Sequence, residues 1–122
     1  MLLFITIVFL LYTIVFLLFP TLEIDGNSMY PTFDDGEKTR CSRIFSRKNL
    51  QVGDVYVYTR RAEDTGKKYL VVKRLQNIGT YEGTTYCFFL GDNLDNSLDS
   101  RHYGWIKSKQ IIAKVKHRER RY

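Results

Sequence analysis

The first 19 positions form an unbroken apolar run, whereas the rest of the chain alternates between apolar and polar residues. Residues 1–19 carry no charge, and their polar members are Thr6, Tyr12 and Thr13. A helix of this length is roughly 28 Å long, close to the hydrocarbon thickness of a bilayer. No basic residue precedes the run and no Ala-x-Ala pattern ends it, which disfavours a cleaved signal peptide. A helix apolar on every side is also unsuited to the core of a small soluble domain. The pattern predicts one membrane-spanning anchor over 1–19, closed by Pro20.

Short alternating segments separated by turns follow, and they predict a mainly β domain over residues 20–122. These residues are rich in Tyr, Phe, Val and Ile, which suit strands. We expect strands at six places: 22–25, 38–45, 55–59, 69–75, 85–90 and 110–116. The predicted fold is a small antiparallel, barrel-like sheet preceded by a single helix.

Charge and cysteine content refine this picture only slightly. The chain has 122 residues and a formal net charge of +6, with a basic run at 114–121. We interpret that run as a solvated tail. Contact with anionic lipid or with nucleic acid is a less favoured interpretation. Cys41 and Cys87 lack the spacing of metal ligands. The sequence is compatible with one disulfide between them and with two separate buried thiols.

Lys73 is an unusual residue for its position in the chain. Alternation places it on the apolar face of the predicted strand, with the side chains of Tyr69, Val71 and Leu75. Burial lowers the pKa of a lysine, and a neutral amine can act as a base toward a serine hydroxyl. On the pattern alone, a lysine that protects the edge of a sheet from aggregation is the favoured interpretation, because such lysines are common.

Ser28 is the candidate nucleophile. It lies in the segment Gly26-Asn27-Ser28-Met29-Tyr30-Pro31-Thr32, where glycine permits unusual backbone angles and proline stiffens the chain. Gly, Asn and Ser also form ordinary surface turns, so the segment by itself favours a turn. A Ser–Lys pair is nevertheless a known variant of the nucleophile–base arrangement.

The loop at 91–104 is dense in Asp, Asn and Ser. It lacks the glycine and the final glutamate of an EF-hand, which disfavours calcium. Such a loop instead forms side chain–backbone hydrogen bonds that make it rigid. An ion pair of Asp99 with Arg101 or Arg74 is expected to hold it. Neither histidine has a convincing partner in the sequence, which disfavours a Ser-His-Asp triad.

The order of these elements resembles the type I signal peptidases, the Ser–Lys leader peptidases. Four stretches carry the resemblance: Ser28-Met29-x-Pro31-Thr32, Val52-Gly53-Asp54-Val55, Lys73-Arg74, and Gly91-Asp92-Asn93-x-x-Asn96-Ser97-x-Asp99-Ser100-Arg101-x-x-Gly104. The resemblance implies that Ser28 is the nucleophile, forming an acyl-enzyme, and that Lys73 is the general base. It also implies a backbone oxyanion hole that includes the N–H of Ser28.

Further roles follow from the same resemblance. Ser97 is expected to orient the lysine amine, and Asp99 is expected to hold the core together with Arg74 and Arg101. Shallow apolar substrate pockets are expected to be lined by Ile24, Met29 and Val72. The implied substrate is a secretory preprotein cut after small residues, typically Ala-x-Ala. We expect the protein to bind no metal, no cofactor and no nucleic acid. We expect a monomer that contacts membrane lipid, with its catalytic domain on the extracytoplasmic side of the cell membrane.

Departures from the family pattern leave an alternative of another class. The family usually has a Gly-x-Pro-Gly-Asp turn after Lys-Arg, and residues 75–80 do not match it. Gly26 stands where some members have a serine that donates to the oxyanion. The segment between Arg74 and Gly91 is short, which predicts a minimal catalytic core. The alternative is an inactive, signal-peptidase-like assembly factor for a surface protein. A self-cleaving repressor is disfavoured, because the apolar run occupies the place of its DNA-binding segment.

Overall fold

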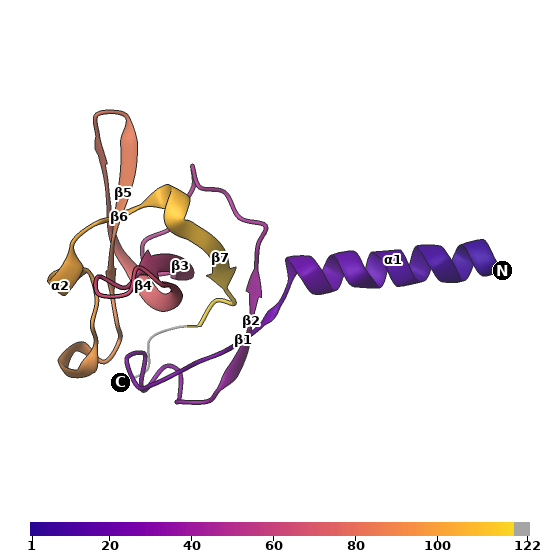
Figure 1. The fold of residues 1–122 in the computed structure, drawn as a ribbon, viewed down its shortest axis with the longest axis horizontal. Helices are drawn as coiled ribbons and strands as arrows, with labels where there is room; N and C mark the ends of the chain where they lie inside the picture. Colours follow the sequence, from indigo (N-terminus) through magenta and orange to yellow (C-terminus); the bar gives the residue numbers. More distant parts are fainter. Residues whose placement is uncertain (119–122) are drawn as a thin grey trace.

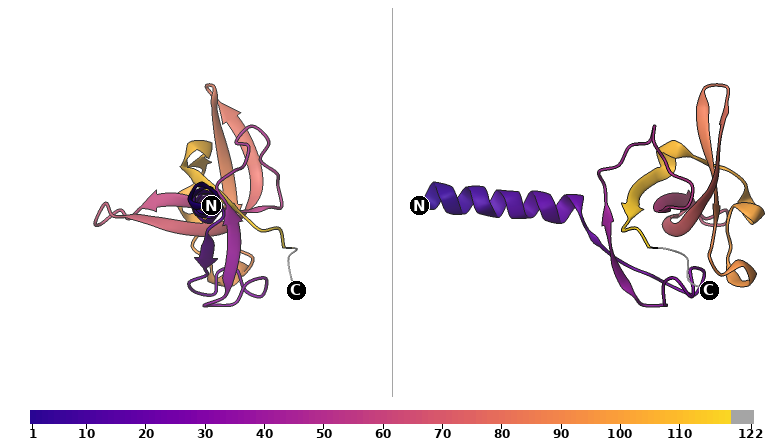
Figure 2. Two further views of the ribbon diagram at one scale, coloured as in Figure 1. Left: turned by 90° about the vertical axis from the view of Figure 1, so that its right-hand side faces the viewer. Right: turned by 180° about the vertical axis from the view of Figure 1, so that it is seen from behind.

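The structure is a computed structural model that describes residues 1–118. A single helix projects from a β domain, and the N-terminus lies at its far end (Figure 1). Seen along this helix, the strands surround its axis (Figure 2). The elements in chain order are α1 (Leu2–Leu18), β1 (Thr21–Glu23), β2 (Lys38–Ser42), β3 (Val55–Arg61), β4 (Lys68–Tyr81), β5 (Thr84–Leu90), η1 (Leu94–Asn96), α2 (Ser100–Tyr103), β6 (Ile106–Lys107), η2 (Ser108–Gln110) and β7 (Ile111–Val115).

Helix α1 is shorter than the predicted anchor. It has 17 residues, none of them buried, and Phe19 leaves the helical backbone just before Pro20. At about 1.5 Å per residue the helix is about 26 Å long, against about 30 Å for the hydrocarbon core. Within residues 1–118, no helix has the length and apolar character needed to cross a membrane. The predicted membrane-spanning helix is corrected accordingly.

The strands form one antiparallel sheet, which confirms the mainly β prediction. Its order is β1-β2-β7-β3-β4-β5-β6, so β1 and β6 form the two edges of the described sheet, whereas the last strand, β7, lies inside it. The described sheet is therefore open and curled, without the closure of a barrel. Apolar side chains that alternate along β3, β4 and β7 form two packed clusters, one around Tyr58 and Phe89 and the other around Met29 and Val57.

Strand β4 runs further than the pattern predicted. It continues from Lys68 to Tyr81 with an irregularity between Leu75 and Asn77. The chain reverses only at Glu82 and Gly83, where both residues have positive φ. The resulting β4–β5 hairpin extends from the domain in a different direction from α1 (Figures 1 and 2). A bulge thus lets the strand continue beyond residue 75, where the predicted strand ended.

Two further predictions are settled by the packing. Cys41 and Cys87 are free and buried in different clusters, so the structure has two thiols. Of the basic run 114–121, residues 119–121 lie outside the described residues. Arg118 is packed against the domain, where its guanidinium donates to the carbonyl of Thr32 (3.0 Å) and pairs with Glu37. The solvated-tail interpretation is therefore wrong for Arg118.

Candidate active site

Ser28 and Lys73 meet at the surface of the sheet. Ser28 follows Gly26, whose φ of 87° lets the chain turn sharply after β1. Lys73 lies in β4, paired with Tyr56 of β3. Lys73 Nζ lies 2.7 Å from Ser28 Oγ, within hydrogen-bond distance. The structure thus brings together the two residues that the sequence singled out.

The Lys73 amine lies in a mainly apolar environment. The residue is 6% exposed, and no ion pair among residues 1–118 includes it. Burial lowers the pKa of Lys73 from 10.5 to about 8, and the negative charge of Asp99 limits this decrease. A substantial fraction of the amine is therefore neutral in mildly alkaline solution and able to accept the proton of a hydroxyl.

Backbone contacts from the Asx-rich loop hold the Ser28 turn in place. The N–H of Asn93 donates to the carbonyl of Ser28 at 2.9 Å, and the Asn93 side chain donates to the carbonyl of Asn27 at 3.0 Å. Among the hydrogen bonds of residues 1–118, none is donated by the backbone N–H of Ser28. This N–H is one group that can bind an oxyanion as it forms beside the hydroxyl.

A cleft of about 380 Å³ lies over the Ser28–Lys73 pair. Its floor includes Ile24 and Met29, both buried, and the half-buried Val72, the three residues predicted to line substrate pockets. The complete lining is Leu22, Glu23, Ile24, Asp25, Ser28, Met29, Tyr69, Leu70, Val71, Val72, Lys73, Leu98 and Tyr103. The two walls are thus the end of β1 with the residues after it, and the first half of β4.

Arg74 points away from this cleft and has a partner that the sequence analysis missed. Its guanidinium donates two bonds to Asp92, at 2.8 and 2.7 Å, and a third to the carbonyl of Gly53 at 2.6 Å. The hydroxyl of Thr32 donates to the same carboxylate at 2.6 Å. Arg74 therefore pairs with Asp92 and not with Asp99. The sequence did contain a signal for this role, because Asp92 belongs to the motif in the Asx-rich loop at 91–104.

Asp99 and Arg101 form the other ion pair of the loop. The Arg101 guanidinium donates to both Asp99 oxygens, at 2.9 and 3.0 Å, and the N–H of Gly91 adds a bond at 3.0 Å. Burial alone would raise the pKa of Asp99, but the hydrogen bonds from Arg101 and Gly91, with the Ser97 hydroxyl nearby, lower it to about 2. Asp99 also caps α2, and its backbone N–H donates to His102. The carboxylate is thus a charged support for the loop.

Ser97 lies beside the Ser28–Lys73 pair without a bond to Lys73. Its hydroxyl is buried, and in residues 1–118 it has no hydrogen-bond partner of good geometry, although it lies near Asp99. Gly91 separates it from Ser28: a Cβ at Gly91 would lie 2.1 Å from Ser97 Oγ and 2.6 Å from the carbonyl oxygen of Ser28. Only glycine lets the loop approach the Ser28 turn this closely.

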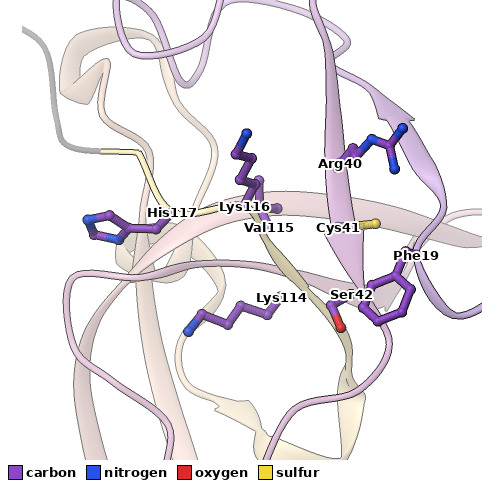
Figure 3. A pocket seen from close by; sticks show the side chains of 8 residues that line it. All are labelled: Phe19, Arg40, Cys41, Ser42, Lys114, Val115, Lys116 and His117. Atoms are coloured by element: carbon purple, nitrogen blue, oxygen red, sulfur yellow. The ribbon is translucent and has the colours of Figure 1, made fainter.

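A second pocket, of about 320 Å³, lies where α1 meets the domain and does not include Ser28 or Lys73. Its lining is Phe19, Arg40, Cys41, Ser42, Lys114, Val115, Lys116 and His117 (Figure 3). The figure shows Arg40 reaching to one side and Lys114 and His117 to the other, so these side chains do not converge on one point. Lys114 and His117 pair with Asp54 at 3.0 and 3.3 Å. The pocket is a basic surface beside the helix.

Comparison with known proteins agrees with this geometry. A family model described as signal peptidase, peptidase S26, matches residues 1–81 and 76–118. A segment of 28 residues is 61% identical to the signal peptidase I of Buchnera aphidicola subsp. Baizongia pistaciae (strain Bp), covering 23% of this chain and 9% of that protein. The chain thus matches only a small part of this relative's length. Because the family matches extend over residues 1–118, the chain belongs to the signal peptidases of the peptidase S26 family.

Proposed function

We propose that the protein is a serine endopeptidase that removes signal peptides from secretory preproteins, with Ser28 as nucleophile and Lys73 as general base. The observation that carries the proposal is the 2.7 Å separation of Lys73 Nζ and Ser28 Oγ, with the amine buried and its pKa near 8. Family membership supports the peptidase activity. No metal or cofactor is needed for this chemistry.

The reaction proceeds through an acyl-enzyme. The neutral Lys73 amine takes the proton of Ser28 as Oγ attacks the scissile carbonyl, and the oxyanion is bound by the backbone N–H of Ser28. The intermediate collapses, the C–N bond breaks, and the Lys73 ammonium returns its proton to the departing amine. Lys73 then takes a proton from a water molecule as its oxygen attacks the ester carbon. The C–O bond to Ser28 breaks, and the Lys73 ammonium gives this proton to Ser28 Oγ, which releases the free carboxyl group.

The walls of the cleft suit an extended peptide. Within residues 1–118, β1 pairs on one side only, with β2, and residues 68–73 of β4 pair with β3, whereas β5 begins to pair at Arg74. Both strands therefore offer unpaired backbone edges to the cleft, and a substrate strand is able to hydrogen-bond to them. Because Ile24 and Met29 fill the floor, we propose that only small side chains, such as alanine, fit beside Ser28.

We further propose that the helix contacts membrane lipid and that the catalytic domain acts on the extracytoplasmic side. None of the α1 residues is buried, and the exposed cations Arg40 and Lys116 lie where α1 joins the domain (Figure 3). Apolar side chains next to cations favour lipid surfaces with anionic head groups. The purified chain should sediment with phosphatidylglycerol vesicles more than with phosphatidylcholine vesicles. Equal recovery in the supernatant with both would exclude this lipid contact.

The peptidase proposal is tested with the full chain in detergent and a preprotein that carries an Ala-x-Ala site. Wild type should cut once, after the second alanine, and Ser28→Ala and Lys73→Met should not. Mass spectrometry should detect an ester-linked fragment on Ser28 at short times. Absence of cleavage by wild type, or cleavage retained in both variants, would overturn the proposal and favour a non-catalytic assembly factor.

A further inference from the structure

The cleft over the catalytic pair continues into a longer groove. The next pocket along the surface shares Tyr69, Leu98 and Tyr103 with it. A third pocket along this surface, of about 660 Å³, shares Arg60, Arg61 and Tyr103 with that neighbouring pocket. The three pockets are therefore one continuous path that begins at Ser28 and passes over Tyr103.

The charge of this path changes along its length. Glu23 and Asp25 line the catalytic end. The far end is basic, and its cations are Arg60, Arg61, Lys68 and Lys109. Among residues 1–118, no ion pair includes any of these four cations. Glu63 and His102 lie at the middle pocket, so the surplus of positive charge is concentrated at the far end.

Arg60 is held in a fixed position without a carboxylate. Its guanidinium lies 3.5 Å above the centre of the Tyr103 ring and donates to the hydroxyl of Tyr69 at 2.9 Å. The Tyr103 hydroxyl is in turn hydrogen-bonded to that of Tyr58, which is fully buried. A planar cation fixed in this way loses little side-chain entropy when it binds a carboxylate.

The sheet register sets the distance from the scissile bond. Arg60 pairs with Tyr69 across the sheet, and Tyr69 is four positions before Lys73 on β4. An extended peptide that follows the open edge of β4 advances by about 3.3 Å per residue, as the strand itself does. Such a peptide reaches the basic end about four residues from the scissile bond.

We infer that the preferred substrates carry an acidic segment, beginning about four residues from the cleaved bond, on the side that runs along β4 toward Tyr69. The inference rests on the proposed peptidase function, and it assigns Arg60, Arg61, Lys68 and Lys109 to substrate selection. Opposite charges steer association and are screened by salt, so the preference should be strongest at low ionic strength.

The test compares three peptides with the same Ala-x-Ala site. One is neutral beyond the site, and the other two carry three aspartates, beginning four residues before or four residues after the cleaved bond. With wild type at low salt, one of the acidic peptides should have a kcat/KM about tenfold above that of the neutral peptide. In the triple variant Arg61→Gln, Lys68→Gln, Lys109→Gln, this ratio should fall toward one.

Lys67→Gln is the matched control, because Lys67 is the exposed neighbour of Lys68 but does not line the groove. It should keep the wild-type ratio. Binding of fluorescent acidic and neutral peptides to the Ser28→Ala variant measures peptide affinity for the groove without cleavage. Wild type that cuts no peptide refutes the peptidase proposal. Wild type that cuts all three peptides equally, or an acidic preference that persists in the triple variant, refutes the acidic segment.

Discussion

Lys73 and Arg74 are adjacent cations on β4 that are buried to the same degree, 6% and 5% exposed, but they face opposite sides of the sheet. Arg74 meets the Asp92 carboxylate with two hydrogen bonds. Among the described residues, Lys73 Nζ has only the hydroxyl of Ser28 within hydrogen-bond distance. One side of the strand is thus a fully paired support, and the other is an unpaired amine at the edge of a cleft.

This difference shows how one strand can hold two buried cations for different purposes. A buried charge is tolerated when a carboxylate compensates its lost hydration. Without one, the proton is released more readily, which is the source of the pKa of about 8 at Lys73. The buried Lys73 amine therefore destabilises the fold where it is protonated, and the Arg74–Asp92 pair holds the strand in position. The following predictions test the two sides separately.

The largest effect is expected at Lys73. Lys73→Met should lower kcat/KM by about 10²–10⁴-fold, because it removes the general base. The same change should raise the free energy of unfolding below pH 8 by up to about 3 kcal/mol, since burial disfavours the protonated amine. The sign follows from the lowered pKa: the gain should shrink between pH 8 and 10.5 and vanish above it. Urea unfolding at several pH values measures it, and a destabilised variant would contradict this account.

The opposite outcome is expected on the paired side. Asp92→Asn leaves Arg74 charged, buried and without its carboxylate, and should lower the free energy of unfolding by about 3–5 kcal/mol. Asp95→Asn is the matched control, since Asp95 is exposed in the same loop. A thermal unfolding series should show a large drop in Tm for the first variant and almost none for the second. Equal Tm values would mean that the Arg74–Asp92 pair does not stabilise the fold.

Gly91 joins the two sides, and its replacement should affect both stability and activity. In Gly91→Ala the new Cβ would meet Ser97 and the backbone of Ser28, costing about 1–3 kcal/mol and displacing the nucleophile. Gly79→Ala is the control, because its Cβ would lie 3.8 Å from Trp105, an ordinary contact. Cleavage rate and Tm should both fall in the first variant only. Normal kinetics in Gly91→Ala would contradict the close approach.

The pH dependence reports directly on the unpaired amine. The base must be neutral to act, so kcat/KM should rise about tenfold per pH unit below a midpoint near pH 8 and level off above it. Asp99, with its pKa of about 2, stays charged throughout and should add no second step. Rates are measured between pH 6 and 10 with a peptide whose own charge is constant, at about 0.1 M salt. A flat profile would exclude Lys73 as the base.

The sequence predicts one side of this comparison better than the other. Alternation identified Lys73 as a charged residue on an apolar face of the strand. Side chains on a strand change faces at every residue, so the sequence itself shows which residues share a face. The partner of Arg74 was missed because ion pairs depend on which loop folds over which face, and Asp92 and Asp99 are equally acidic in sequence. The length of β4 was missed for a similar reason: a bulge at Leu75–Asn77 continues a strand that its polar residues would otherwise end.

The smallest effect is expected at Ser97, where the resemblance and the geometry differ. The resemblance assigns its hydroxyl to the lysine amine, whereas the described structure gives that hydroxyl no partner of good geometry. Ser97→Ala should therefore change the free energy of unfolding by less than about 0.5 kcal/mol, since no hydrogen bond is lost. If substrate binding brings the hydroxyl to Lys73, kcat should fall and the pH midpoint should move, while KM stays constant. Ser100→Ala is the control, because its hydroxyl accepts a bond from Phe89 at 2.9 Å and its loss should lower Tm. A Ser97→Ala enzyme with unchanged kcat and midpoint would leave the lysine to be oriented by burial and by Ser28 alone.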